Sequence, residues 1–155
     1  MKRPALLSKA ELHHAQVITD LTREAYKKWV AKIGREPTPM GVDYAQALGV
    51  HRFDLASDGE ELVGVIETSL EIDHLLIVNI AVRPDRQGLG LGHQLLAHAE
   101  SLARSSGHRE LRLYTNGAFT ENIALYRQQG YEIISEEVSE LGVKVNMSKW
   151  LAHPA

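Results

Sequence analysis

The sequence predicts a mixed α/β fold, in which helices cover the faces of one β-sheet. Three observations predict it: helical patterns come first, a run of strand patterns follows, and the second half alternates strand and helix patterns. The chain has 155 residues, of which 44% are hydrophobic, as is ordinary for a globular protein with one core. No linker or repeat divides it, so we expect a single domain spanning residues 1–155.

Helical patterns dominate the beginning of the chain. Ser8 and Glu11 have the spacing of a capping box, in which each side chain satisfies the other residue's amide, so they predict a helix start. Apolar residues then recur at helical spacing, at Val17, Ile18, Leu21 and Ala25. Two prolines and two glycines exclude a regular helix over Gly34–Gly41, and a short helix is expected over Val42–Leu48.

Strand patterns occupy the middle of the chain. The segments His51–Ala56 and Leu62–Ile72 are joined by an Asp-Gly pair, which is a strong hairpin signal. Leu75–Val82 is a nearly continuous apolar run of strand length. Such a run is typical of a central strand that is buried on both faces.

The second half predicts helices and strands in alternation. A long helix follows residue 90, presents an apolar face that includes Leu95, Leu96 and Ala99, and ends near Gly107. The remaining elements are a strand, a helix and a closing hairpin, predicted at Glu110–Tyr114, at Thr120–Gln129, and at Tyr131–Val138 with Val143–Lys149.

Composition narrows the possible functions. The chain has no cysteine, which excludes disulfides, thiolate catalysis and Cys-based zinc sites. A formal charge of −3 offers no general attraction for nucleic acid or anionic lipid, and no segment is apolar for long enough to span a membrane. The basic start at Met1–Arg3 leads into no apolar signal core. We therefore expect a cytoplasmic protein without a nucleic-acid or membrane partner.

A glycine-rich turn, Gln87–Gly92, separates the apolar strand from the long helix. A helix start leaves backbone amides unpaired and carries partial positive charge, so it binds phosphate without a basic patch. Glycines let the turn wind tightly and let an anion come close to the amides. The turn therefore predicts a pyrophosphate site, although a tight strand-to-helix turn without a ligand would use the same residues.

Three ligand classes use such a turn. A P-loop requires Gly-Lys-Ser/Thr, but Gly92 is followed by His93 and Gln94, which excludes it. The dinucleotide motif requires G-x-G-x-x-G, and here the third glycine comes one position too early. An acyl-CoA loop is the third class.

The segment Gln-Gly-Leu-Gly-Leu-Gly at Gln87–Gly92 resembles the acyl-CoA loop of the GNAT superfamily, and Ala81–Pro84 resembles that family's strand exit. Asn122–Glu132 is similar to the family's second conserved segment, with shorter internal spacing. The resemblance covers roughly Leu62 to Glu132. It implies a largely antiparallel mixed sheet of six or seven strands, with a splayed central strand and flanking helices.

The resemblance also implies how acetyl-CoA binds. The backbone of Ile80, Ala81 and Val82 would pair with the pantetheine arm, and an amide near Ile80 would stabilise the oxyanion. Asn122 would bond the pantetheine amides, and Tyr126 would protonate the leaving thiolate. Helix capping by Asn122 and core packing of Tyr126 are the alternative interpretations. The diphosphate would be bound by the loop amides of Gln87, Gly88, Leu89, Gly90, Leu91 and Gly92.

The acceptor side is less clearly marked in the sequence. An amine has an unperturbed pKa of about 10 and must lose a proton to react, and Glu67 and Glu71 are the candidate bases. The proline-containing loop that carries Arg35 and Met40, followed by Tyr44, is the expected acceptor pocket, with Arg35 able to bind a substrate carboxylate. No histidine has a metal-ligand spacing, so no metal is expected.

The predicted function is direct transfer of an acetyl group from acetyl-CoA to a primary amine, with a small molecule favoured over a protein as acceptor. No covalent enzyme intermediate is expected, because no cysteine is present and no serine lies in a nucleophile elbow. The alternatives are a non-catalytic acyl-CoA sensor and a structural subunit. A homodimer is a reasonable expectation, since the closing strands of this fold often pair between subunits.

Overall fold

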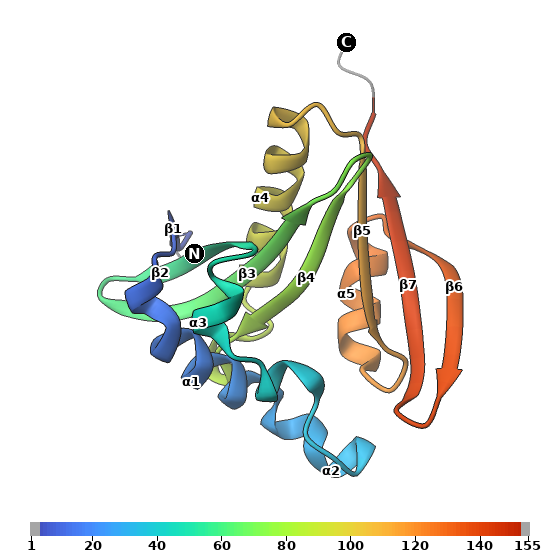
Figure 1. The fold of residues 1–155 in the computed structure, drawn as a ribbon, viewed down its shortest axis with the longest axis horizontal. Helices are drawn as coiled ribbons and strands as arrows, with labels where there is room; N and C mark the ends of the chain where they lie inside the picture. Colours follow the sequence, from blue (N-terminus) through green and yellow to red (C-terminus); the bar gives the residue numbers. More distant parts are fainter. Residues whose placement is uncertain (1–3, 153–155) are drawn as a thin grey trace.

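One seven-stranded sheet runs through the computed structural model, which describes residues 4–152 (Figure 1). Its strand order is β1-β2-β3-β4-β5-β7-β6, and every neighbouring pair is antiparallel except β4 and β5, which are parallel. This confirms the predicted mixed, largely antiparallel sheet. The strands are β1 (Leu6–Lys9), β2 (Arg52–Asp58), β3 (Glu61–Leu70), β4 (Leu75–Val82), β5 (Glu110–Asn116), β6 (Glu132–Ser139) and β7 (Gly142–Trp150).

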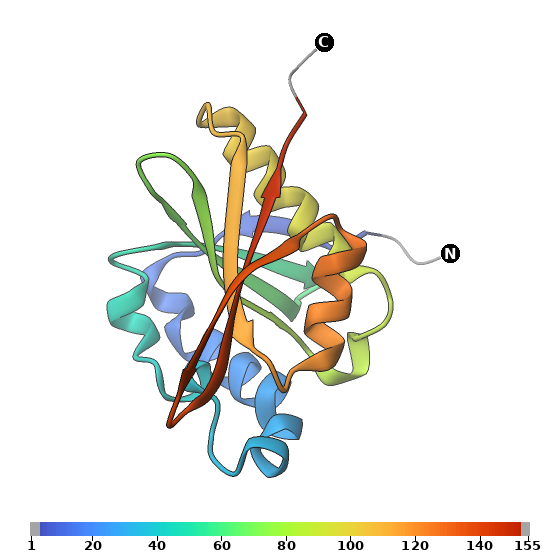
Figure 2. The same ribbon diagram turned by 90° about the vertical axis from the view of Figure 1, so that its right-hand side faces the viewer.

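Helices cover both faces of the sheet (Figure 2). The N-terminal helices lie on one face, and α4 and α5 lie on the other. The first face carries α1 (Ala15–Tyr26), α2 (Val30–Ile33) and α3 (Tyr44–Ala47), with 3-10 turns η1 (Leu12–His14), η2 (Lys27–Trp29) and η3 (Thr38–Gly41). The second face carries α4 (Leu91–Ser105) and α5 (Thr120–Gln128), and η4 (Pro84–Arg86) links β4 to the glycine turn.

Two hydrophobic cores hold these layers together. The core under α4 and α5 includes Ile66, Leu95 and Leu96, none of which is exposed to solvent. The core under α1 includes Ile18 and Phe53. Complete burial of one such side chain contributes about 1.5–3 kcal/mol, so both layers are fixed firmly to the sheet between them.

The start of the chain corrects one prediction. Ser8 lies in β1, where it pairs with Leu55 of β2, so the capping box of Ser8 and Glu11 is wrong. The first turn is capped instead within η1, where the amide of Glu11 donates to Nδ1 of His14 at 2.9 Å. A strand forms at Leu6–Lys9 because the edge of β2 satisfies its backbone groups, and that partner lies more than 40 residues away in the sequence.

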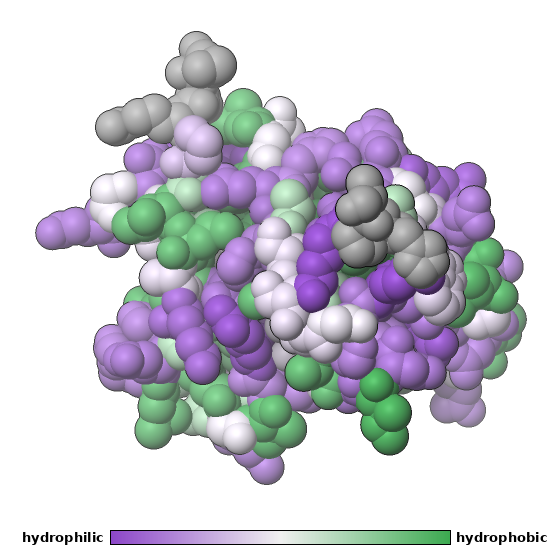
Figure 3. Space-filling view, turned by 90° about the horizontal axis from the view of Figure 1, so that it is seen from above, coloured by the Kyte–Doolittle hydropathy of each residue, from purple (hydrophilic) through white to green (hydrophobic). Residues whose placement is uncertain are grey.

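The surface seen from above the view of Figure 1 mixes hydrophilic side chains with scattered hydrophobic ones (Figure 3). No helix between residues 4 and 152 is long and apolar enough to cross a membrane. Met1–Arg3, the basic start that the sequence predicts is not a signal peptide, lie outside the described residues.

Candidate active site

The sheet splits between β4 and β5. These strands pair only where Leu75–Ile77 meets Leu111–Leu113, and beyond that point they diverge (Figure 1). Strands that separate leave main-chain groups unpaired inside the molecule, and such groups need partners. The predicted splayed central strand is therefore present, and its open end is a natural place for a ligand that brings its own hydrogen-bonding groups.

A β-bulge lies at the point of divergence. Thr68 of β3 pairs with Ile77 while Glu67 pairs with Asn79, so Val78 is the extra residue on β4. An inserted residue reverses the alternation of side chains along a strand. As a result, Ile77 and Ile80 both face the core under α4, whereas Asn79 points to the α1 side and bonds Tyr26.

The glycine turn leads directly into the N-terminus of α4. Gly88 and Gly90 have φ values of 77° and 89°, which glycine adopts without strain. A Cβ added to either would meet nothing within 4 Å, so the space beside both residues is open. Gly90 is the N-cap and supplies no side-chain cap to α4. The amides of the first helical turn are therefore not satisfied by a capping side chain, as an anion site requires.

Gly92 has a different role. A Cβ at this position would lie 2.9 Å from Cδ2 of Leu125, closer than real atoms approach. The glycine therefore lets α4 and α5 pack closely on one side of the open strand end.

A cleft of about 590 Å³ lies between the glycine turn, β4, α5 and η2. Most of the predicted cofactor residues line it: Ile80, Ala81, Val82, Gln87, Gly88, Gly90, Gly92, Asn122 and Tyr126. Leu89 and Leu91 do not, since the Leu91 side chain is buried in the core under α4 and Leu89 is 45% exposed. For these two residues only the main chain remains a candidate for anion binding.

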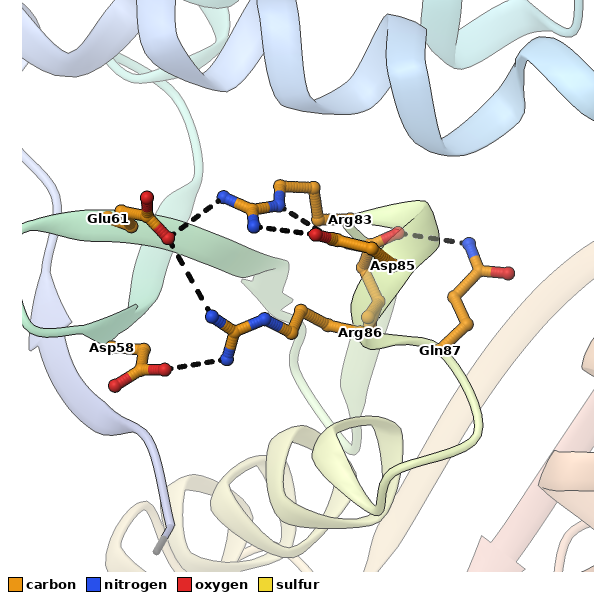
Figure 4. Close-up of polar contacts among 7 residues, drawn as sticks. Asp58, Glu61, Arg83, Asp85, Arg86 and Gln87 are labelled. Carbon is orange, nitrogen blue, oxygen red and sulfur yellow. Dashed lines mark hydrogen bonds and ion pairs between the residues drawn. The ribbon is translucent and has the colours of Figure 1, made fainter. Parts of the chain in front are cut away.

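Ion pairs hold η4, the segment that leads into the glycine turn, against the β2–β3 hairpin (Figure 4). Arg83 bonds both carboxylate oxygens of Asp85 at 2.7 and 2.8 Å and reaches Glu61 at 3.3 Å. Arg86 contacts Asp58 at 2.6 Å. Both arginines are occupied by carboxylates of η4 and of the β2–β3 hairpin, so they shape the turn.

Lys28 lines the cleft and links two of its walls. Its ammonium group lies 2.7 Å from Oε1 of Gln87 and 3.0 Å from Oε2 of Glu121, which joins η2 to the glycine turn and to α5. Gln87 also donates through Nε2 to the carbonyl of Val82 at 3.0 Å. Lys28 is the one Lys or Arg among the described residues that line the cleft.

Tyr126 lies at the inner wall of the cleft, and its side chain is 7% exposed. Burial raises the pKa of Tyr126 to about 12. Its hydroxyl is therefore protonated at neutral pH, as a proton donor to a leaving thiolate must be. Its ring packs edge-on against Tyr131, with ring centroids 6.1 Å apart.

A second, smaller cavity of about 220 Å³ lies on the other side of the open strand end. The loop around Pro37 and Pro39, the bulged Val78 and the β6–β7 hairpin turn form its walls. Of the three predicted acceptor residues, only Arg35 lines it. Met40 packs into the core under α1, and Tyr44 is buried beneath the loop, where its hydroxyl donates to the carbonyl of Pro39 at 2.7 Å.

Tyr26 separates the two cavities and lines both of them. Its hydroxyl donates to Oδ1 of Asn79 at 2.7 Å and lies 3.2 Å from the carbonyl of Ile80. Phe119 packs 6.1 Å from the Tyr26 ring and lines the smaller cavity. Among the described residues, Tyr26 is the one that lines both cavities.

The two predicted bases occupy different places. Glu67 is buried beside this region, and Nδ1 of His51 lies 2.7 Å from its Oε2. Burial raises the pKa of Glu67, against a smaller lowering by His51. Tyr114 lines the smaller cavity, and its pKa is raised, mainly by burial and to a smaller extent by the charge of Glu67. The Glu67 carboxylate therefore acts electrostatically on a residue of that cavity.

Glu71 is exposed in the β3–β4 turn, where it accepts a bond from Ser69. This turn is beyond the paired ends of β4 and β5, about 13 Å along the strand from Glu67 at 3.3 Å per residue. The structure brings Glu67 and not Glu71 to the open part of the sheet.

Several residues of the site were missed from the sequence: Tyr26, Lys28, His51, Tyr114, Phe119 and Lys144. Tyr26 and Trp29 continue the apolar face of α1, so an aromatic residue with a polar group on that face was the available signal. The others had no local signal. Across residues 4–152, no three His, Asp or Glu side chains are grouped as metal ligands would be, and the absence of a metal remains a prediction.

Residues 16–131 match the family model described as the Acetyltransferase (GNAT) family. That match covers most of the chain, and the chain belongs to this family. Among curated protein sequences, none matches this chain.

Solved structures share the fold at low sequence identity. The PaiA N-acetyltransferase from Thermoplasma acidophilum, in complex with coenzyme A, is 20% identical over 97% of this chain and 99% of its own, with a TM-score of 0.82. The ribosomal-protein-S18-alanine N-acetyltransferase from Escherichia coli is 19% identical over 97% and 96%, with a TM-score of 0.77. A GNAT family acetyltransferase from Elizabethkingia anophelis with acetyl-CoA bound is 18% identical over 97% and 100%, with a TM-score of 0.71.

The larger cleft fits an acyl-CoA by its own chemistry. Open space beside Gly88 and Gly90 admits a phosphate to the start of α4. The splayed end of β4 offers its main chain to an extended arm, and there the carbonyls of Ile80 and Val82 already accept from Tyr26 and Gln87. The buried Tyr126 hydroxyl then lies at the inner wall.

Proposed function

We propose that this protein is an N-acetyltransferase that moves an acetyl group from acetyl-CoA directly to a primary amine of a small molecule. One observation carries the proposal: two cavities meet at Tyr26, on the open end of β4. The larger has the glycine turn of an acyl-CoA site, and the smaller has room for a small acceptor.

The backbone positions the donor in this proposal. Amides from Gln87 to Gly92 bind the diphosphate, and the main chain of Ile80–Val82 pairs with the pantetheine arm as an added strand does. Asn122, on the opposite wall, bonds the pantetheine amides. A main-chain amide near Ile80 stabilises the negative charge that develops on the thioester oxygen.

Two side chains move protons. Glu67 accepts, through ordered water, the proton that the amine loses as its nitrogen bonds to the acetyl carbon. Tyr126 donates its phenolic proton to the sulfur as the carbon–sulfur bond breaks, and it recovers a proton from solvent. The products are the amide and the free thiol of CoA. No group of the protein is acylated on this route.

Free thiol release tests the proposal. Acetyl-CoA is incubated with the protein and a panel of primary amines, and the thiol is measured together with the acetylated product. We expect amine-dependent release from at least one small acceptor. Tight acetyl-CoA binding without release on any acceptor would instead support a non-catalytic sensor.

Ligand-dependent stability provides the matching binding measurement. Acetyl-CoA at one hundred times its Kd should stabilise the folded protein by about 2.7 kcal/mol. No stabilisation would favour a structural subunit. A cytoplasmic location and a homodimer remain predictions made from the sequence, and gel filtration with light scattering tests the second.

A further inference from the structure

The smaller cavity has a charge distribution of its own, and this inference rests on its being the acceptor site of the proposed transferase. Two cations, Arg35 and Lys144, line it, and no Asp or Glu among the described residues does so. Much of the remaining lining is apolar or aromatic, with Pro37, Val78 and Tyr114 among it. A cavity of this composition favours an apolar body that carries an anion.

The cations come from different elements. Arg35 belongs to the loop before η3, and its guanidinium donates to the carbonyls of Glu36 and Leu141 at 3.1 Å each. Those bonds tie the loop to the β6–β7 turn and fix the position of the charge. Lys144 belongs to β7, and its ammonium lies 4.6 Å from the centre of the Tyr114 ring.

Neighbouring carboxylates are held by other groups or lie outside the cavity. Glu137 lies 3.9 Å from Lys144 and accepts a shorter bond, 2.9 Å, from Asn146. Glu36 is paired with Arg23 at 2.9 Å. Glu136 and Glu140 line an adjoining groove, which shares Arg35 and the hairpin turn with this cavity, but neither carboxylate lines the cavity itself. The positive charge of Lys144 is therefore only weakly compensated at the cavity.

A negative charge, that of Glu67, lies behind Tyr26. The buried Glu67 pairs on the sheet with Asn79, and Asn79 accepts the hydrogen bond of Tyr26 at the edge of this cavity. An amine is cationic until it loses its proton, so it is attracted to the Glu67 side. A buried carboxylate thus lies behind the Tyr26 side of the cavity and cations lie on its lining, an arrangement that matches a zwitterion.

We propose that the acceptor is a small amino-carboxylate with an apolar body, whose amine points to Tyr26 and whose carboxylate lies between Arg35 and Lys144. The volume of about 220 Å³ is below the usual range of about 300–1,000 Å³ for drug-sized ligands, which suits a molecule of this size. The same charges disfavour polyamines, which would place a second cation beside Lys144.

Three probes on one scaffold test the inference: para-(aminomethyl)benzoate, benzylamine and para-xylylenediamine. They share a reacting aminomethyl group and an aromatic ring, and they carry an anion, nothing or a cation at the far end. We expect kcat/KM to fall in that order, by about fivefold at each step, as for a partly exposed charge pair. Equal values, or a preference for the diamine, would overturn the inference.

Reversing the charge of Lys144 tests its role directly. Lys144→Glu should lower kcat/KM for the carboxylate probe and raise it for the diamine. Lys144→Gln should narrow the differences between the three probes without removing them, because Arg35 remains. Lys9→Gln is the matched control, because Lys9 lies on the edge strand β1, away from both cavities. An unchanged probe order in Lys144→Glu would contradict the assigned role of Lys144.

Calorimetric titration of the three probes into the CoA-bound protein gives a readout that does not require turnover. Affinities in the same order, together with no thiol release from acetyl-CoA in the turnover assay with these probes, would support the cavity's selectivity and contradict acetyl transfer. Affinities in a different order would overturn the selectivity even if transfer occurs. The two proposals therefore fail on different measurements.

Discussion

The Tyr26 hydroxyl donates a 2.7 Å hydrogen bond to Oδ1 of Asn79, which joins the end of α1 to the bulged segment of β4. Both side chains are buried, at 8% and 6% exposure. Tyr26 is the wall between the two cavities, so this bond fixes the position at which donor and acceptor would meet. Burial, helped by the neighbouring tyrosines and Glu67, raises the pKa of Tyr26 well above its ordinary value, so the hydroxyl stays protonated and continues to donate.

Tyr26→Phe should lower the free energy of unfolding by about 1–3 kcal/mol, because it removes the partner of a buried amide oxygen. Urea denaturation measures this loss. Asn79→Val and the double variant complete a cycle, and we expect the two single effects to be non-additive by about 0.5–3 kcal/mol. Additive effects would show that the bond contributes nothing of its own.

Tyr126→Phe should lower kcat by about a hundredfold and leave the KM for acetyl-CoA nearly unchanged, because the phenol acts on the leaving sulfur. Steady-state thiol release measures both constants. Tyr131→Phe is the control, since Tyr131 packs against Tyr126 but does not line the cleft. If Tyr126→Phe turned over at the original rate, Tyr126 would have no part in the chemistry.

The pH dependence of kcat/KM should distinguish the two carboxylates proposed from the sequence. As a base, Glu67 must be ionised, and burial raises its pKa, so activity should fall as the pH drops through a value above the ordinary range for Glu. Glu67→Gln should lower kcat/KM by at least about tenfold and remove this acid limb. Glu71→Gln should keep the original profile, and the opposite result would exchange the two roles.

Gly90→Ala should weaken acetyl-CoA binding by about tenfold, because a Cβ would occupy the open space beside the first turn of α4. Gly59→Ala is a matched control: both glycines have positive φ, 89° and 63°, and neither has an atom within 4 Å of an added Cβ. Both variants should lose about 1 kcal/mol of stability from backbone strain.

Thermal denaturation with and without acetyl-CoA separates the two effects. Only Gly90→Ala should lose stabilisation by the ligand. Equal stabilisation of both variants would place the diphosphate away from this turn.

Much of the fold was predictable because its signals are local. The apolar run gave the bounds of β4 correctly, the Asp-Gly pair located the β2–β3 hairpin, and the glycine turn located the start of α4. These features depend on side-chain periodicity and on backbone conformations that only certain residues adopt. The position of the glycine turn was predictable for the same reason, and the diphosphate site proposed there uses only main-chain groups of this one short segment.

The tertiary structure alone decided the acceptor side. Glu67 and Glu71 are equivalent in the sequence, but the bulge at Val78 and the splitting of β4 from β5 bring only Glu67 to the open part of the sheet. Met40 was assigned to a pocket and packs in the core, whereas Lys144, more than a hundred residues away, lines the cavity. Short-range patterns specify which elements form, but the neighbours of a side chain across the sheet depend on register, bulges and strand order.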